Sequence, residues 1–270
     1  MPGSKPEFTV RQEVFIHAPA DIVFAFFAQP EKFSLWFGAG SSLEARKGGV
    51  VRVNFPDGSS AIGEVTDIDP PRSIIFTWGY PRENSPLPPG ASTVEITLSG
   101  EPLGTRVTLL HRLPSDATAR EHAGGWVYHM SRLATIAARA HFAGPGLAAI
   151  EHWFAAWSAD GEECEKLLRA AVTEDVTFRD DAATAFNRAE LQDHIERCHK
   201  FMKGVKLVRK SPVYQCGDQA TCSAIMEAAG KEFGPTRLVF ALAQDGRIKQ
   251  ATGFFETAVP GVTTGSAIGG

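Results

Sequence analysis

A series of five strand-like segments between residues 50 and 113 most constrains what this 270-residue chain can fold into. In each segment apolar and polar residues roughly alternate, which is the pattern of a half-buried strand. Turn-forming sequences separate the segments, including a Pro-rich loop at residues 81–91. Short turns between consecutive strands indicate antiparallel pairing, so this part of the chain predicts a meandering sheet.

Helical patterns flank these five segments. A first strand-like run at residues 8–17 is followed by an apolar helical stripe that starts near Pro19, and Pro30 is expected to stop that helix. After the fifth segment, apolar residues spaced four, three and four apart form one face of a long helix: Trp126, Met130, Leu133 and Ala137. The order predicts a curved antiparallel sheet packed on helices.

The stretch 142–147, Phe-Ala-Gly-Pro-Gly-Leu, is expected to break the long helix and to mark a domain boundary. Three further helical stretches follow, and the last begins with Asn187 and Glu190 in the spacing of a capping box. Four strand-like runs close the chain, with a hairpin turn at Asp245-Gly246. The sequence therefore predicts an α+β protein of two domains, residues 1–142 and 143–257, each a curved antiparallel sheet packed on helices. A disordered tail is expected at 258–270.

Composition narrows the classes of partner. The net charge is −4, and neither basic nor acidic residues are concentrated in one segment, so nucleic acid is not expected as a partner. No apolar stretch approaches membrane-spanning length, and no membrane association is expected. The four cysteines form no CxxC pair and the eight histidines show no metal-ligand spacing, so we expect reduced thiols, no metal, no cofactor and a cytoplasmic location.

A curved sheet wrapped around one helix cannot fill its concave side with short side chains, so that side holds either large aromatic residues or a ligand. In the first domain, the candidate residues for lining such a cavity are Trp36, Phe76, Trp78, Tyr80, His111, His122, Trp126 and Tyr128. His111 shares the face of Val107 and Leu109, and His122 lies one helical turn before Trp126. The alternative is that the aromatic residues are simply core and the histidines are structural.

The first half resembles the START-like helix-grip superfamily, in the branch named after the heat-shock-protein-90 ATPase activator. The resemblance rests on IHAPADIVFAFFAQPEKFSLWFG from residue 16, TRVTLLHRL from residue 105 and GGWVYHMSRLATIA from residue 124. It implies a cavity between the sheet and the C-terminal helix. The branch's name also suggests a co-chaperone-like interaction protein.

The second half resembles the SnoaL-like and ketosteroid-isomerase-like branch of the nuclear-transport-factor-2-like fold, through residues 150–182, the helix NRAELQDHIER and the QDGRIKQATGFF hairpin. The resemblance implies a cone-shaped α+β barrel, with a homodimer through its sheet. It places Asp180 at the position of a general base and Trp153 in the pocket, where the family has a tyrosine donor. Leu238 or Val239 stands where the family has a second donor, so both donors to an enolate oxygen are missing. The alternative for Asp180 is a loop acid or a turn cap.

Three hypotheses follow. The first is that the START-like domain binds a hydrophobic small molecule (aromatic, polyketide-like or steroid-like), with the second domain as a second pocket or a dimerisation module. The second is a cyclase or isomerase that acts on a carbonyl substrate with Asp180 as its base. The third is the co-chaperone-like protein.

Overall fold

The computed structural model describes residues 8–255, so the tail predicted at 258–270 lies outside the described residues. The chain forms two compact units that divide between Ala143 and Gly144. Each unit is described by itself below. The α+β class predicted from the sequence is confirmed for both.

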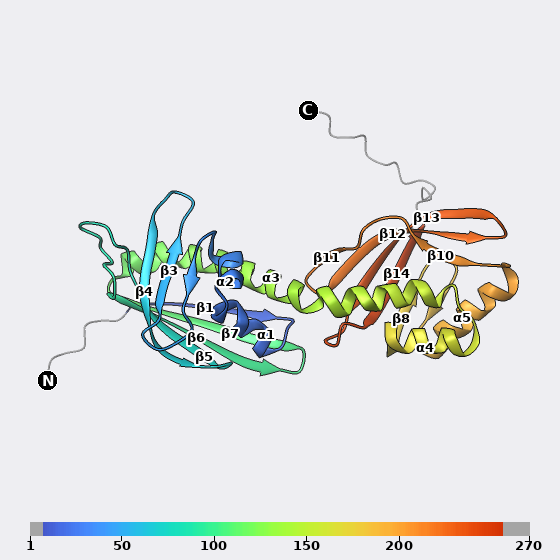
Figure 1. Ribbon diagram of the computed structural model, residues 1–270, viewed down its shortest axis with the longest axis horizontal. Helices are drawn as coiled ribbons and strands as arrows, with labels where there is room; N and C mark the ends of the chain where they lie inside the picture. Colours follow the sequence, from blue (N-terminus) through green and yellow to red (C-terminus); the bar gives the residue numbers. More distant parts are fainter. Residues whose placement is uncertain (1–7, 256–270) are drawn as a thin grey trace, which may run out of the picture. The chain divides into compact units, whose positions relative to one another are not determined.

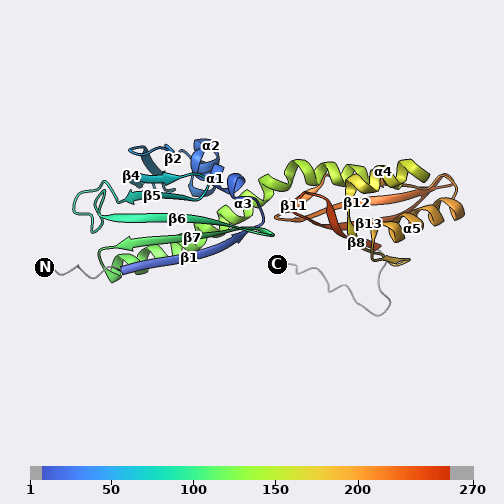
Figure 2. The ribbon, with the colours of Figure 1, turned by 90° about the horizontal axis from the view of Figure 1, so that it is seen from below.

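The first unit is an antiparallel sheet with three helices (Figure 1). Its strands lie in the order β1-β7-β6-β5-β4-β3-β2, so apart from β1 neighbours in the sheet are neighbours in the chain. Figure 2 shows the central strands of this sheet side by side. The elements are β1 (Phe8–Ile16), α1 (Ala20–Ala28), α2 (Pro30–Phe37), β2 (Ser42–Leu43), β3 (Val50–Asn54), β4 (Ser60–Asp69), β5 (Ser73–Trp78), β6 (Ser92–Glu101), β7 (Gly104–Leu113) and α3 (Asp116–Ala156).

Alternation along the strands sets the buried face of this sheet. In β5 the residues Ile74, Phe76 and Trp78 are buried, whereas the residues between them are partly exposed. The register places Trp78 opposite Ser92 of β6, and Val94 of β6 opposite His111 of β7. Two polar side chains therefore lie among the apolar ones on the face that the aromatic stripe of α3 covers, as the sequence predicts for His111.

The prediction that Pro30 stops the first helix is confirmed, because α1 ends at Ala28 and Gln29 has left the helical conformation. The sequence did not predict that Pro30 is also the first residue of a second helix, α2. Proline suits this first position because the N–H that it lacks would have no partner within the helix there.

The predicted helix break at residues 142–147 is wrong, because α3 continues through these residues with Pro145 inside it. Gly144 and Gly146 do not adopt the left-handed conformation that commonly ends a helix. Proline in a helix removes one hydrogen bond, and continuing the helix lets the stripe that includes Ile150, Trp153 and Trp157 bury its apolar side chains.

The second unit is a mixed sheet with strand order β10-β12-β13-β14-β8-β9, and β11 also pairs with β12. It contains α4 (Gly161–Ala171), β8 (Val172–Arg179), β9 (Thr184–Ala185), α5 (Arg188–Phe201), β10 (Lys206–Arg209), β11 (Tyr214–Cys216), β12 (Gln219–Ala228), β13 (Lys231–Leu242) and β14 (Ile248–Phe255). The helices α4 and α5 pack against each other and against β8 (Figure 1). All strands were expected to be antiparallel, but β8 pairs with β14 in parallel.

Two local predictions in this unit have clear outcomes. The capping box is confirmed, because Asn187 Oδ1 accepts a hydrogen bond from the Glu190 N–H at 2.9 Å, and the Glu190 carboxylate accepts one from the N–H of Phe186. The single strand expected at residues 205–216 is instead two strands, β10 and β11, separated by a segment that contains Pro212. A proline cannot donate to a strand ladder, which accounts for the interruption.

The hairpin turn of Gly246 provides a test of the packing around Pro145. Gly246 has φ of +84°, and a Cβ atom there would lie 2.3 Å from Pro145 Cβ, whereas Gly58 has the same φ of +84° with nothing within 4 Å. We expect Gly58→Ala to lower the free energy of unfolding by about 1 kcal/mol through backbone strain alone. We expect Gly246→Ala to cost about 1–3 kcal/mol more through the clash. Denaturant unfolding of both variants measures the difference, and equal losses would contradict the packing described here.

Candidate functional site

A hollow with a volume of about 90 Å³ lies in the first unit. Its walls come from α2, from the ends of β3 and β5, and from α3, and most of its lining side chains are aromatic. The lining residues are Phe37, Phe55, Trp78, Tyr80, Glu121, His122, Gly125, Trp126 and His129.

The structure brings four of the predicted lining residues together at this hollow: Trp78, Tyr80, His122 and Trp126. The prediction for Tyr128 is wrong, because its side chain is exposed on another surface of α3. Trp36 and Phe76 are buried in the core, and they do not line the hollow. The indole N–H of Trp36 donates to the Phe26 carbonyl at 3.0 Å, so this side chain serves the packing of α1 against α2.

His111 is fully buried behind the hollow and fixes one of its walls. The Trp126 Nε1–H donates to His111 Nδ1 at 2.9 Å, so Nδ1 carries no proton. The proton of the neutral ring is then on Nε2, which lies 2.8 Å from the Ser92 hydroxyl oxygen. That hydroxyl donates in turn to the Trp78 carbonyl at 3.0 Å. Burial, followed by the proximity of His122, lowers the pKa of His111 to about 3, in agreement with a permanently neutral ring.

His122 and Tyr80 form a second polar pair. His122 Nδ1 lies 2.7 Å from the Thr118 carbonyl oxygen, which can only accept, so the proton of the neutral ring is on Nδ1. Nε2 is therefore an acceptor, and the Tyr80 hydroxyl, 2.9 Å away, donates to it. Burial raises the pKa of Tyr80, so the phenol keeps the proton that this bond requires. The lone pairs of the Tyr80 oxygen remain as acceptors.

His129 lines the hollow but was not singled out from the sequence. Its Nδ1 lies 3.1 Å from the Trp36 carbonyl oxygen, so Nδ1 donates, and Nε2 of the neutral ring is an acceptor. Burial lowers the pKa of His129, which favours the neutral form. A signal was present in the sequence, because His122, Gly125, Trp126 and His129 are spaced three, one and three apart and share one helical face.

Phe37, Phe55 and Glu121 were also missed. Phe37 follows the apolar stripe of its helix, and its neighbour Trp36 carried the stronger signal, although it is Phe37 that stacks on His129 at 4.6 Å between ring centroids. Phe55 lies in the turn after β3, and no periodic pattern indicates which way a turn residue faces. Glu121 is an exposed helical residue that lines the hollow.

Asp180 in the second unit makes the hydrogen bonds of a turn cap. Its Oδ1 accepts from the N–H groups of Ala182 and Ala183 at 2.8 and 2.7 Å. A turn cap is the role that the sequence predicts for Asp180 as the alternative to a general base. The Asp180 carboxylate also acts on His194. Burial lowers the pKa of His194, and the negative charge of Asp180 opposes this shift.

Trp153 is fully buried in the second unit. Its ring packs against Trp157, Phe178 and Phe240 at centroid distances of 5.7–6.2 Å. Among the residues that the structure describes, its indole N–H has no hydrogen-bond partner. The space where the resemblance implies a pocket is therefore occupied by aromatic side chains around Trp153.

The outer face of the same sheet carries a groove of about 380 Å³ along β8, β9 and β14, which Trp153 and Asp180 do not line. The spacing of Glu227 and Arg237 on neighbouring strands of the sequence also allows a cross-strand ion pair. The register instead places Glu227 opposite Glu232 and Arg237 opposite Ser223.

With this geometry described, the chain can be compared with known proteins. Residues 17–138 match the family model described as "Activator of Hsp90 ATPase homolog 1-like protein" (AHSA1). Through its first unit the chain belongs to the AHSA1-like family. The resemblance inferred from the sequence is confirmed for this AHSA1-like domain, and the hollow lies within the matched residues. No curated protein matches the chain.

Several solved structures are similar to parts of the chain. An AHSA1-like protein from Rhizobium etli is 30% identical, with 51% of this chain and 86% of that chain covered and a TM-score of 0.40. CalU16 from Micromonospora echinospora is 28% identical over 47% of this chain and 73% of its own, with a TM-score of 0.38. A SnoaL-like family protein from Agrobacterium tumefaciens is 20% identical over 42% of this chain and 98% of its own, with a TM-score of 0.39.

Two features are absent from residues 8–255. None of the helices there is long and apolar enough to cross a membrane. No group of three or more histidine, cysteine and acidic side chains in the same range is arranged to hold a metal ion.

The assignment of His111 predicts its behaviour in acid. We expect ¹⁵N NMR to show the neutral Nε2–H tautomer of His111 from pH 8 down to about pH 4, because the folded pKa is about 3. The unfolded chain takes up this proton near pH 6.5, so the folded state loses stability as pH falls from 6.5 towards 3. The loss from this group is about 1.4 kcal/mol per pH unit. Titration of the folded His111 ring near pH 6 would contradict the assignment.

The turn cap at Asp180 is tested by paired alanine variants. We expect Asp180→Ala to lower the free energy of unfolding of the full chain by about 1 kcal/mol, since two backbone N–H groups lose their acceptor. Asp181→Ala, at the exposed neighbouring position, is the control and is expected to change stability by less than about 0.5 kcal/mol. Denaturant unfolding measures both variants. An unchanged free energy of unfolding in Asp180→Ala would contradict the assignment of Asp180 as a turn cap.

Proposed function

We propose that the AHSA1-like domain binds a hydrophobic small molecule, or the apolar end of a larger one, in the hollow between its sheet and α3. The observation that carries the proposal is a hollow walled by aromatic side chains, with a few polar groups whose protonation is fixed by their own hydrogen bonds. Apolar walls with a small number of oriented polar groups are the general character of small-molecule sites.

The size of the hollow limits what enters it. Sites that enclose drug-sized ligands have volumes of about 300–1,000 Å³, whereas this hollow has about 90 Å³. A single ring or a compact alkyl group fits such a volume. A polyketide-like or steroid-like ligand would place one end in the hollow and leave the rest outside.

Ligand binding is favoured over the cyclase or isomerase hypothesis by the state of the second unit. The Asp180 carboxylate is used by the turn, and aromatic residues around Trp153 occupy the interior where a substrate would have to lie. A general base needs a substrate within hydrogen-bond reach. The hollow of the AHSA1-like domain is therefore the better-supported site.

Two adjacent glycines of α3 provide a matched test of the proposed site. Gly125 lines the hollow, and an added Cβ there meets nothing within 4 Å, whereas Gly124 has equal space but lines a shallow surface on another side of the helix. We expect Gly125→Leu to fill the hollow and to weaken binding of a one-ring probe, phenol, at least tenfold. Gly124→Leu is expected to leave binding unchanged.

Binding is measured on the full chain by the shifts of the five tryptophan indole N–H signals in ¹H–¹⁵N NMR spectra. We expect phenol to shift the signals of Trp78 and Trp126, and to leave those of Trp153 and Trp157 in place. Both variants replace glycine with a better helix former, so a loss of folding is not expected in either. Equal phenol binding by the two variants, or shifts confined to the second unit, would overturn the proposal.

A further inference from the structure

We propose that the hollow of the AHSA1-like domain is selective for an organic cation, namely a methylated or quaternary ammonium group. The inference rests on the proposed function, because it names the chemical class of the group that enters the same hollow. It follows from the arrangement of the rings, the protonation of the polar groups and the charge of the lining.

The aromatic rings enclose the hollow from several directions. Phe37 lies 5.6 Å from Trp126 with the ring planes at 82°, and 5.7 Å from Trp78 at 31°. Trp78 in turn lies 6.4 Å from Tyr80 at 86°, and Phe55 lies 6.3 Å from Tyr80. The lining rings are thus inclined to one another at several angles, and a compact group fits between inclined rings better than a flat ring does. The face of each ring carries negative potential and attracts cations within about 6 Å of its centre.

The polar atoms of the lining are mainly acceptors. His129 donates through Nδ1 to the Trp36 carbonyl, which leaves Nε2 as an acceptor. Tyr80 donates to His122, which leaves its oxygen as an acceptor. The indole N–H of Trp126 is committed to His111. Among the described residues, the indole N–H of Trp78 has no hydrogen-bond partner of normal geometry. It lies near enough to Tyr80 to lower that phenol's pKa in part, against the larger effect of burial.

The lining carries one formal charge, and it is negative. Glu121 is the only lining residue that is charged at neutral pH when the histidines are neutral. Arg82 lies outside the lining, where its guanidinium carbon is 5.6 Å from the centre of the Tyr80 ring. An anionic guest would meet Glu121 with like charge and would find few donors. A neutral guest would gain nothing from the charge of Glu121 or from the negative potential of the ring faces and acceptor atoms.

Matched probes of similar size separate charge from shape. The probes are tetramethylammonium, neutral tert-butanol and anionic pivalate, each titrated into the full chain at constant ionic strength while the indole N–H signals are followed. We expect tetramethylammonium to bind at least about tenfold more tightly than tert-butanol, the range that a partly desolvated cation–π site gives. Pivalate is expected to bind most weakly.

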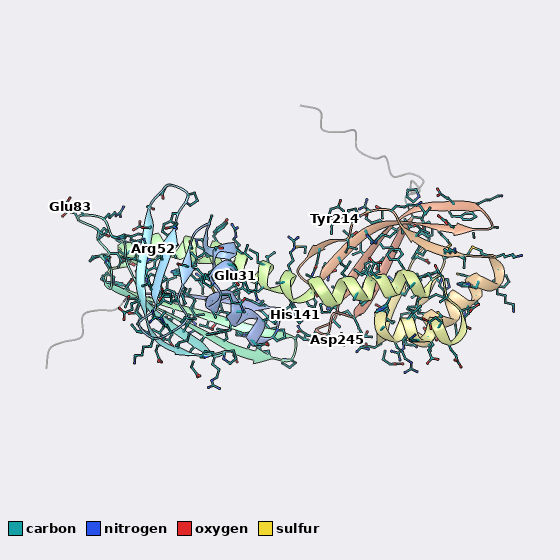
Figure 3. The ribbon with its side chains drawn as sticks, viewed as in Figure 1. Glu31, Arg52, Glu83, His141, Tyr214 and Asp245 are labelled. Carbon is teal, nitrogen blue, oxygen red and sulfur yellow. The ribbon has the colours of Figure 1, made fainter. Side chains whose placement is uncertain are left out.

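Two variants test the source of the selectivity. Glu121→Gln removes the charge but keeps the shape, and it is expected to weaken tetramethylammonium binding about two- to fivefold without changing that of tert-butanol. The matched control is Glu83→Gln, in the loop between β5 and β6, where Figure 3 shows Glu83 pointing away from the unit. It is expected to change neither. Phe55→Leu, at a half-buried turn position, replaces an aromatic ring with an apolar side chain and is expected to weaken the binding of tetramethylammonium but not that of tert-butanol.

The outcomes distinguish this inference from the proposed function. Equal affinity for tetramethylammonium and tert-butanol, or tighter pivalate binding, overturns the cation selectivity and leaves an apolar binding site in place. If no probe shifts the Trp78 or Trp126 signals and phenol does not either, both proposals are wrong. Tetramethylammonium binding that responds equally to Glu121→Gln and Glu83→Gln reflects general surface charge and also overturns the inference.

Discussion

In the AHSA1-like domain, the hydrogen bond from the Trp126 indole to His111 joins α3 to the sheet. It fixes the orientation of the indole ring, which apolar packing alone does not specify. Apolar contacts alone would allow the large indole ring several orientations against the sheet. The donor on Trp126 and the acceptor on His111 select one, and Ser92 and the Trp78 carbonyl complete the chain of donors and acceptors. A buried network of this kind is stable only when every polar group in it has a hydrogen-bond partner. Here the proton of His111 lies on Nε2, so both ring nitrogens have a partner.

The consequence of this network is a hollow with rigid walls. Trp126 and Trp78, which are tied to the same histidine and serine, form two of its sides. The neighbouring pair of His122 and Tyr80 fixes the polar side in the same way. Walls that keep their position without a ligand lower the entropic cost of binding one. The small volume and the fixed acceptors then decide which groups fit.

Much of the fold could be predicted from the sequence, because its patterns are local. The alternation in β5, β6 and β7 identifies the buried face, including that of His111, and the capping box identifies the start of α5. The gaps occurred where local rules allow two outcomes. Pro30 both follows the end of α1 and begins α2, of which only the first was predicted. Pro145 is tolerated inside α3 because its surroundings bury the helical stripe. The parallel pairing of β8 with β14 depends on contacts far apart in the sequence.

The site was less predictable than the fold for a physical reason. Trp36, Phe76 and Trp78 carry equal aromatic signals, but burial in the core or at a hollow depends on the neighbours that each side chain meets in space. His129 lies one helical turn after Trp126, and Glu121 lies directly before His122. Their role follows only once the face of α3 is known. The dimer expected through the second unit stays a prediction.

The most direct test of the central claim is a crystal structure of the full chain soaked with 4-bromophenol, with the bromine located by anomalous scattering. The account predicts a bromine peak in the hollow between Trp78 and Trp126, with the hydrogen bond from Trp126 to His111 unchanged. An empty or collapsed hollow, with bromine bound only elsewhere on the protein, would contradict it.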